Sequence, residues 1–215
     1  MIRILLLDDH AVVRSGYRRL IDAEPDMEVV AEAADADEAY ARVKSDAPDL
    51  AIVDLNLRGA SGVEAIRRIK SRDASLRILV LSMHDGANFV TQAFRAGATG
   101  YLTKCSEPAL MVDAIRDVAD GRRVMSPDVA QALASASLES GDLMTQLTPR
   151  EFEVLRLAVR GESTANIAEH MHLSQKTVLN YLSAVRQKLD ADNDFSLLHL
   201  AARHGLVDIE APGAC

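Results

Sequence analysis

Short apolar runs alternate with amphipathic stretches along the first 120 residues of the chain. Runs rich in Leu, Ile and Val predict strands buried on both faces of a parallel sheet. These strands are expected at residues 2–7, 28–33, 50–53, 77–81 and 99–102. Helical periodicity in the intervening stretches predicts helices at residues 11–23, 36–46, 61–72, 86–96 and 107–120. Alternating strands and helices predict a doubly wound α/β domain of five parallel strands over residues 1–121.

The pattern changes after Ser126, and residues 122–146 are expected to form a linker with a short helix near 127–136. Beyond it there are helix signals and no strand signals. Thr148 and Glu151 have the spacing of a capping box, with proline at the first helical position. Helices are expected near 149–160, 164–171, 174–189 and 195–204. Residues 147–210 are therefore expected to form a second, all-α domain of four helices.

Composition narrows the function classes. The chain is 48% hydrophobic and 26% charged, and it has no apolar run near the length of a membrane span, so no membrane partner is expected. Its two cysteines, Cys105 and Cys215, are not expected to pair, which fits the reducing cytoplasm. The formal net charge is −8, of which residues 126–215 contribute −5. This balance argues against a large nonspecific nucleic-acid footprint.

Polar side chains follow four of the predicted strands. Asp8 and Asp9, Asp54, Ser82 and Lys104 come just after separate apolar runs. Because the carboxyl ends of parallel strands form one crevice, we expect these side chains to meet there. Three carboxylates would repel one another, and Mg²⁺ would relieve that repulsion. An aspartate can accept a phosphoryl group covalently, while a lysine and a hydroxyl hold its oxygens, so the sequence predicts a phosphoryl-acceptor site.

A second candidate site lies on the helix predicted at 174–189. Its apolar stripe is Val178, Leu182, Val185 and Leu189. The segment has three basic residues and no acidic one, which suits the major groove of DNA. The polar surface contains Lys176, Thr177, Asn180, Ser183, Arg186, Gln187 and Lys188. Asn180 or Gln187 could read adenine, and Arg186 and Lys188 are expected to contact phosphates. A solvated amphipathic face is the alternative.

With these residues in view, residues 1–120 resemble the receiver domain of two-component response regulators, which implies a flavodoxin-like fold. By this resemblance Asp54 is the phosphoacceptor. Asp8, Asp9, Asp54 and Asn56 are the metal site for Mg²⁺, and Ser82, Tyr101 and Lys104 are the phosphoryl-binding and switch residues. Asn56 and His84 stand where receivers modulate the rate of phosphoryl loss. Gly62 also matches the family pattern.

Residues 147–155, 167–168 and 173–178 resemble the LuxR-type helix-turn-helix, and together with the receiver they resemble the NarL/FixJ family. This resemblance implies a phosphorylation-controlled transcriptional regulator rather than an enzyme. The implied partners are a sensor histidine kinase, double-stranded DNA, a second copy of the phosphorylated chain and, further, RNA polymerase. The dimer seam could use Phe195, Leu198, Leu200 and Ala201, although packing onto the other three helices explains the same pattern.

The chain departs from the family pattern at several positions. Leu179 stands where members often have lysine; it removes a basic contact and could instead touch a thymine methyl. The acidic residues of segment 190–194 would repel nearby phosphates. Cys105 replaces a common proline after Lys104, which leaves the geometry of that peptide bond open.

Two other functions remain at this point. A signalling adaptor, whose helical domain binds protein rather than DNA, would explain Leu179 and the acidic C-terminal half. A phosphatase with an aspartyl nucleophile would also place an aspartate after a strand. Such enzymes usually have a second aspartate two residues on, where this chain has Asn56.

Overall fold

The computed structural model describes residues 1–57, 60–138 and 143–207, and the chain divides into two compact units. The first unit is Met1–Glu139 and the second is Ser140–Cys215. Each unit is described by itself. The last residues of the expected second domain, 208–210, lie outside the described residues.

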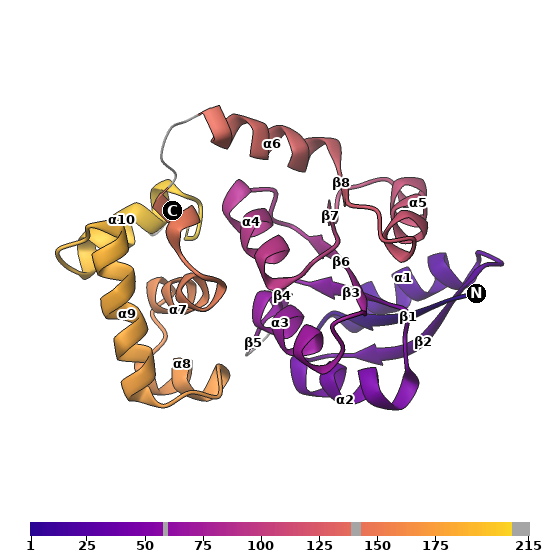
Figure 1. Ribbon diagram of the computed structural model, residues 1–215, viewed down its shortest axis with the longest axis horizontal. Coiled ribbons are helices and arrows are strands. Elements are labelled where there is room, and N and C mark those ends of the chain that lie inside the picture. The colour runs from indigo at the N-terminus through magenta and orange to yellow at the C-terminus, as the bar shows by residue number, and fades with distance from the viewer. Residues whose placement is uncertain (58–59, 139–142, 208–215) are drawn as a thin grey trace, which may run out of the picture. The chain divides into compact units, whose positions relative to one another are not determined.

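A parallel sheet forms the centre of the first unit (Figure 1). Its order is β2-β1-β3-β6-β7-β8, and all five expected strands are confirmed. The strands are β1 (Ile2–Leu7), β2 (Met27–Ala33), β3 (Leu50–Asp54), β6 (Arg77–Ser82), β7 (Gly100–Thr103) and β8 (Val124–Met125). A separate antiparallel pair consists of β4 (Asn56–Leu57) and β5 (Ala60–Ser61). β1, β3, β6 and β7 lie between neighbours, which explains their continuous apolar sequences.

Helices cover both faces of this sheet (Figure 1). They are α1 (Ala11–Asp22), α2 (Ala36–Asp46), α3 (Gly62–Arg72), α4 (Ala87–Ala96) and α5 (Pro108–Ala119). Apolar residues of α1 and α5 pack against Ile4, Leu6 and Leu79 in one buried cluster. α2, α3 and α4 lie on the opposite face. The confirmed doubly wound arrangement brings the carboxyl ends of β1, β3, β6 and β7 to one edge.

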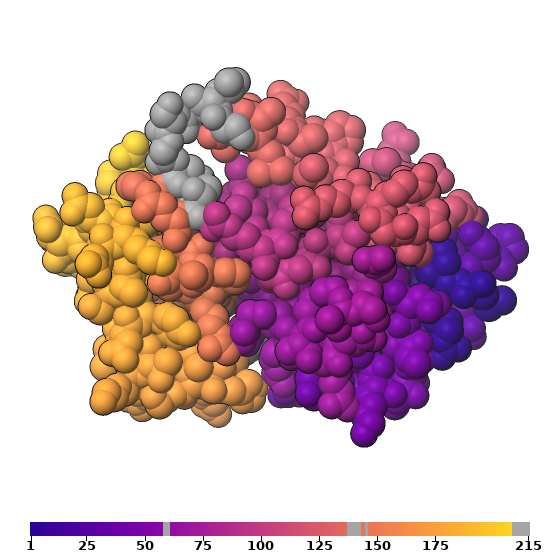
Figure 2. All heavy atoms as spheres, in the orientation of Figure 1, coloured from indigo at the N-terminus to yellow at the C-terminus, as the bar shows by residue number. Residues whose placement is uncertain are grey.

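The first part of the expected linker belongs to the first unit. β8 pairs in parallel with β7 as a sixth strand. The helix α6 (Pro127–Leu138) contacts α4 and β7, and Figure 2 shows its atoms beside those of the rest of the first unit. The expected count of five strands is therefore one too low. A strand of two residues has too few positions for an alternation pattern to be visible in the sequence. The segment expected as a linker at 122–146 thus contains a strand, the helix α6 and a 3₁₀ turn.

The described residues of the second unit form helices joined by turns, without a strand, as expected. It contains the turn η1 (Leu143–Gln146) and the helices α7 (Pro149–Val159), α8 (Thr164–His170), α9 (Gln175–Leu189) and α10 (Asp194–Arg203). The capping box at the start of α7 is confirmed: the Thr148 hydroxyl accepts from the Glu151 N–H, and the Glu151 carboxylate accepts from the Thr148 N–H. Val154, Ile167, Val178 and Leu182 are buried in a shared core.

No helix in the described parts of the chain is long and apolar enough to cross a membrane.

Candidate functional site

The acidic residues predicted from the sequence meet at the carboxyl edge of the sheet. β1 and β3 are parallel neighbours, so Asp8, just after β1, lies beside Asp54 at the end of β3. One ligand atom from each of Asp8, Asp9, His10 and Asp54 can be chosen so that all four lie within 4.8 Å of one another. Asp8 and Asp54 are only 4% and 3% exposed. Burial of negative charges this close together demands compensation by a cation.

Lys104 supplies part of that compensation. Its Nζ lies 2.7 Å from Oδ2 of Asp8 and 2.7 Å from Oδ2 of Asp54. Burial works to lower the pKa of Lys104, but hydrogen bonds and attraction from the two carboxylates outweigh it and raise that pKa above its usual value. The ammonium group therefore stays charged at neutral pH, between the two buried carboxylates. The Lys104–Cys105 peptide bond, left open by the sequence, is trans.

Ser82 and Tyr101 converge on the loop after β6. The buried Ser82 hydroxyl accepts from the His84 N–H at 3.1 Å, and the Tyr101 hydroxyl donates to the His84 carbonyl at 2.6 Å. Burial is the main cause that raises the pKa of Tyr101 far above its usual value, so the phenol is neutral. Both side chains are thus hydrogen-bonded to the backbone of the same residue.

Asn56 and His84, each two residues past a strand-end residue of the site, are joined to each other. The Asn56 N–H donates to Oδ1 of Asp54 at 3.1 Å, and its side-chain Oδ1 lies 3.1 Å from Nε2 of His84. The imidazole also stacks on Phe89 at a centroid distance of 4.2 Å. The Asn56 side chain is therefore engaged with His84, while its backbone orients the Asp54 carboxylate.

Two residues beside the acidic cluster were not singled out from the sequence. Nδ1 of His10 lies 3.2 Å from Oδ1 of Asp8 and 2.8 Å from Oδ1 of Asp9. Arg14 donates to the Asp8 carbonyl at 2.5 Å and to Glu32 at 3.2 Å, which holds the end of β1 against α1. His10 directly follows the two acids, so its position was a usable signal. Nothing in the sequence indicates that the Arg14 side chain points toward Asp8.

Gly62, the first residue of α3, lies directly against the backbone next to Asp54. Its N–H donates to the Leu55 carbonyl at 3.1 Å. A Cβ at this position would lie 2.2 Å from the Asp54 carbonyl oxygen and 2.4 Å from Cα of Leu55. Only glycine allows α3 to begin this close to the backbone of Asp54 and Leu55.

The second candidate site, on α9, has one buried face and one exposed face. The predicted inner stripe of Val178, Leu182, Val185 and Leu189 is buried, as expected. Five of the eight residues expected to contact DNA are exposed: Lys176, Leu179, Asn180, Ser183 and Gln187. These positions recur with the helical period and form one continuous face.

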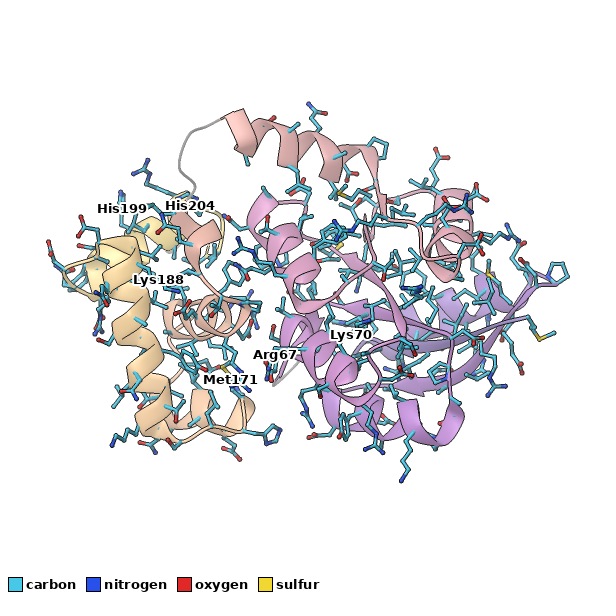
Figure 3. The ribbon with its side chains drawn as sticks, in the orientation of Figure 1. Arg67, Lys70, Met171, Lys188, His199 and His204 are labelled. Carbon is cyan, nitrogen blue, oxygen red and sulfur yellow. The ribbon has the colours of Figure 1, made fainter. Side chains whose placement is uncertain are left out.

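The other three residues expected to contact DNA are engaged within the unit. Thr177 binds Ser174 at the start of α9. Arg186 forms an ion pair with Asp194, at 39% and 79% side-chain exposure. Lys188, which Figure 3 labels on α9, donates to Oε2 of Glu151 at 2.6 Å and so ties α9 to the cap of α7. Arg186 and Lys188, which are expected to contact phosphates, thus each have an acidic partner within the unit.

The surface of α10 is divided in the same way. Ala201 is buried in the unit, whereas Phe195 is 85% exposed and Leu198 and Leu200 are half-buried. A groove of ≈ 520 Å³ lies between the end of α7, α9 and α10 and is lined in part by Leu179, Phe195 and Leu198. Of the four seam residues expected from the sequence, Ala201 thus packs onto the other helices.

Comparison with known proteins assigns both units. The family model of the response regulator receiver domain matches residues 4–116, and that of the bacterial regulatory proteins of the luxR family matches residues 145–201. The response regulator UvrY of Escherichia coli (strain K12) is 35% identical over 213 residues, which are 98% of this chain and 98% of UvrY.

Solved structures agree with this assignment. A two-component response regulator of the LuxR family from Aurantimonas sp. SI85-9A1 is 51% identical with a TM-score of 0.62, over 64% of this chain and 99% of that one. RcsB from Salmonella enterica serovar Typhimurium, solved bound to a promoter in the presence of the phosphomimetic BeF3⁻, is 25% identical with a TM-score of 0.74. That similarity covers 94% of this chain and 98% of RcsB. The chain therefore belongs to the NarL/FixJ response regulators, DNA-binding transcriptional regulators in which a receiver domain precedes a LuxR-type helix-turn-helix domain.

Proposed function

We propose that this response regulator accepts a phosphoryl group on Asp54 from a sensor histidine kinase, and that phosphorylation controls DNA binding by α9. The observation that supports this most directly is the bridge from Lys104 to both Asp8 and Asp54 at 2.7 Å in a buried acidic pocket. Asp8, Asp54 and Lys104 meet there from three strands that are far apart in sequence.

The transfer step uses groups of this pocket, the Mg²⁺ that its acids would hold, and a phosphohistidine donor. An oxygen of the Asp54 carboxylate attacks phosphorus, the phosphorus–nitrogen bond to the donor imidazole breaks, and the nitrogen keeps the electron pair. Lys104 faces the attacking carboxylate and can follow the phosphoryl oxygens as negative charge builds on them. The Asn56 N–H, 3.1 Å from Oδ1 of Asp54, fixes the orientation of the nucleophile.

The donor set fits Mg²⁺. Asp8, Asp9 and Asp54 offer carboxylate oxygens, the ligands that this hard cation prefers, and Asn56 would add an oxygen to the set. When bound, the ion would neutralise the carboxylates and the incoming phosphoryl oxygens. Lys104 already pairs with two of these acids, so the pocket does not depend on the metal alone for charge balance.

The switch residues connect this chemistry to the rest of the receiver. Ser82 and Tyr101 hold the two backbone groups of His84, so a phosphoryl group that draws the Ser82 hydroxyl toward it also disturbs the loop that Tyr101 contacts. Phosphorylation thereby biases an equilibrium between two arrangements of this loop.

For the DNA contacts we propose the exposed stripe of α9. Lys176 would contact a phosphate, Asn180 or Gln187 would read adenine, and Leu179 would touch a thymine methyl. Arg186 and Lys188 act within the unit in this proposal, because both have acidic partners. RcsB is described as two dimers on two parallel DNAs, and we infer a homodimer for the phosphorylated form of this chain too. RNA polymerase would be the partner after DNA, tested by transcription from a bound promoter.

The test is phosphorylation by acetyl phosphate and Mg²⁺, followed on a phosphate-affinity gel and by mobility shift of genomic DNA fragments. We expect the wild type to be modified and to bind DNA more tightly, and Asp54→Asn to do neither. Asp113→Asn, at an aspartate with 74% side-chain exposure, is the matched control and should behave as the wild type.

Modification of Asp54→Asn at the wild-type rate would contradict the assignment of the phosphoacceptor. Chelation of Mg²⁺ should abolish modification of the wild type. If the phosphorylated protein binds no DNA at any salt concentration, the adaptor function, with a protein bound to the helical domain, replaces this proposal.

A further inference from the structure

The start of α6 is tied to the strand that carries Tyr101 and leads into Lys104. We propose that α6 is the output lever of the receiver, coupled to the phosphorylation site by the hydrogen bond from Thr103 to Asp128. Asp128 is then a positioning residue, which acts through Thr103 on the turn that holds Lys104. This inference rests on the proposed function, because it concerns how phosphorylation at Asp54 reaches the DNA-binding domain.

Two hydrogen bonds make the connection. The Thr103 hydroxyl donates to Oδ2 of Asp128 at 2.8 Å, and the Ser126 N–H donates to the Tyr101 carbonyl at 3.1 Å. Thr103 is only 6% exposed, so its hydroxyl needs a partner inside the unit, and an unsatisfied buried hydroxyl would be costly. Both bonds join β7 to the residues at which α6 begins, so the start of α6 is held against the strand that contains Tyr101.

The position of Thr103 gives this bond its significance. Thr103 precedes Lys104, whose Nζ binds the carboxylates of Asp8 and Asp54. The same hydroxyl lies 3.3 Å from Oγ of Ser106, and the Ser106 N–H donates to the Thr103 carbonyl at 3.0 Å. A movement of Lys104 toward a phosphoryl group therefore pulls on a turn whose other anchor is Asp128.

The charge of Asp128 strengthens the link. Burial works to raise the pKa of the Asp128 carboxyl, but hydrogen bonds from its neighbours, Thr103 among them, leave that pKa below its usual value. The group is thus a carboxylate at neutral pH, and a hydrogen bond to a charged acceptor is stronger than one to a neutral acceptor. A neutral acceptor at this position would weaken the coupling without removing it.

The place of α6 in the chain makes it a lever. α6 contacts α4 and β7 in the first unit, and the chain passes from its end at Leu138 into the residues that lead to the second unit. Any rotation of α6 on β7 is therefore delivered to the covalent connection between the units.

The test separates coupling from phosphorylation. The chain has no tryptophan, so Ser135→Trp on the exposed surface of α6 gives a single fluorescent reporter. In this background Thr103→Val removes the hydroxyl, and Thr103→Ser keeps it as the matched control. BeF3⁻ with Mg²⁺ is the phosphoryl mimic, and the DNA is a genomic fragment selected by BeF3⁻-bound wild type.

In the reporter protein and in Thr103→Ser, we expect BeF3⁻ to change the fluorescence and to raise the DNA affinity. In Thr103→Val the gain in affinity should shrink by about fivefold, the scale of one net hydrogen bond, and the fluorescence change should be largely lost. Phosphorylation of Asp54 by acetyl phosphate should stay within about twofold of wild type, because the Thr103 hydroxyl binds Asp128, whereas Lys104 binds Asp8 and Asp54. Asp128→Ala should reproduce Thr103→Val, and Asp128→Asn should fall between Asp128→Ala and wild type.

An undiminished gain in affinity in both Thr103→Val and Asp128→Ala would overturn the lever. The same holds if the fluorescence change persists in full. If BeF3⁻ leaves the DNA affinity of the wild type unchanged, the proposed function fails before the coupling is reached, and the two failures are distinguishable. Asp128→Ala, at a surface position, guards against misfolding of the variant at the buried Thr103.

Discussion

At the scale of single residues, the tightest constraint around Asp54 is steric and lies at Gly62. The Cβ that any other residue would bring meets backbone atoms of Asp54 and Leu55, and backbone cannot move aside as a flexible side chain can. The helix start at Gly62 and the carboxylate of Asp54 are therefore positioned together.

We predict opposite effects for two glycine substitutions. Gly62→Ala should lower the free energy of unfolding by about 1–3 kcal/mol, because overpacking forces the backbone of β3 to shift, and it should slow phosphorylation by acetyl phosphate. Gly16→Ala is the matched control: it lies in α1 with nothing within 4 Å of its Cβ position, and it should raise stability by about 0.5–1 kcal/mol through helix propensity. Urea unfolding of both variants measures this, and a Gly62→Ala protein as stable as wild type would remove the steric constraint.

The residues of the acidic site could be predicted because their positions depend on topology. A polar residue directly after a buried strand must reach the carboxyl edge, so Asp8, Asp54 and Lys104 were expected together and are together. The partners of long charged side chains are different. Lys188 shares a helix with Lys176, and only the packing of α7 against α9 brings Glu151 within its reach. No pattern within 174–189 contains that information.

At the scale of elements, the α7 cap and α9 act as one structure. Glu151 accepts from the Thr148 N–H at 2.7 Å and from Lys188 at 2.6 Å. Burial works to raise the pKa of Glu151, but hydrogen bonds from Lys188 and Thr148 outweigh it and lower that pKa. A carboxyl with a lowered pKa in the folded state stabilises the fold above its usual pKa and loses that contribution as pH falls through the folded value.

From this we predict that Glu151→Gln destabilises the second unit by about 1–2 kcal/mol at pH 7, the scale of a lost helix cap. The difference from wild type should shrink as the pH falls below the usual pKa of glutamate and through the lowered pKa of the folded state, where the wild-type carboxyl becomes protonated too. Thermal unfolding followed by circular dichroism at several pH values measures this. Glu169→Gln, at an exposed glutamate of α8, should cost almost nothing. A pH-independent loss in Glu151→Gln would mean that packing, rather than charge, stabilises the cap.

Element boundaries could be predicted where a side chain or a period marks them, and not elsewhere. The capping box at Thr148 could be predicted from the spacing of Thr148 and Glu151, and it is confirmed. Ser106 also looks like the cap of a helix that starts with proline, yet α5 has Glu107 at its N-cap with no side-chain bond, and the Ser106 hydroxyl lies beside Thr103 instead. β8 could not be seen either, because its two residues are a strand only through pairing with β7.

At the scale of the whole molecule, an acidic protein must bind a polyanion. The net charge of −8 repels DNA at long range, so binding depends on a few local contacts. On α9 the ion pairs of Arg186 and Lys188 reduce the cationic surface further, while Lys176 remains exposed.

We therefore predict a shallow salt dependence in which Lys176 is a main contributor. Lys176→Ala should weaken DNA binding across sequences and reduce the slope of log K against log salt by about one per subunit. Lys188→Met, the control at an ion-paired lysine, should leave that slope unchanged while it lowers thermal stability. Mobility shifts over a salt series measure both slopes. If Lys188→Met lowers the slope as Lys176→Ala does, Lys188 exchanges its acidic partner for a phosphate on DNA.

The pairing of β8 with β7 has a practical consequence for anyone who recombines modules of this family. A hybrid regulator joined after residue 121 would discard the outermost strand together with α6 and leave one side of β7 without its partner. A junction within residues 139–142 would keep β8 and α6 together with the receiver domain. The foreign DNA-binding domain would then follow the same helix as the native one does.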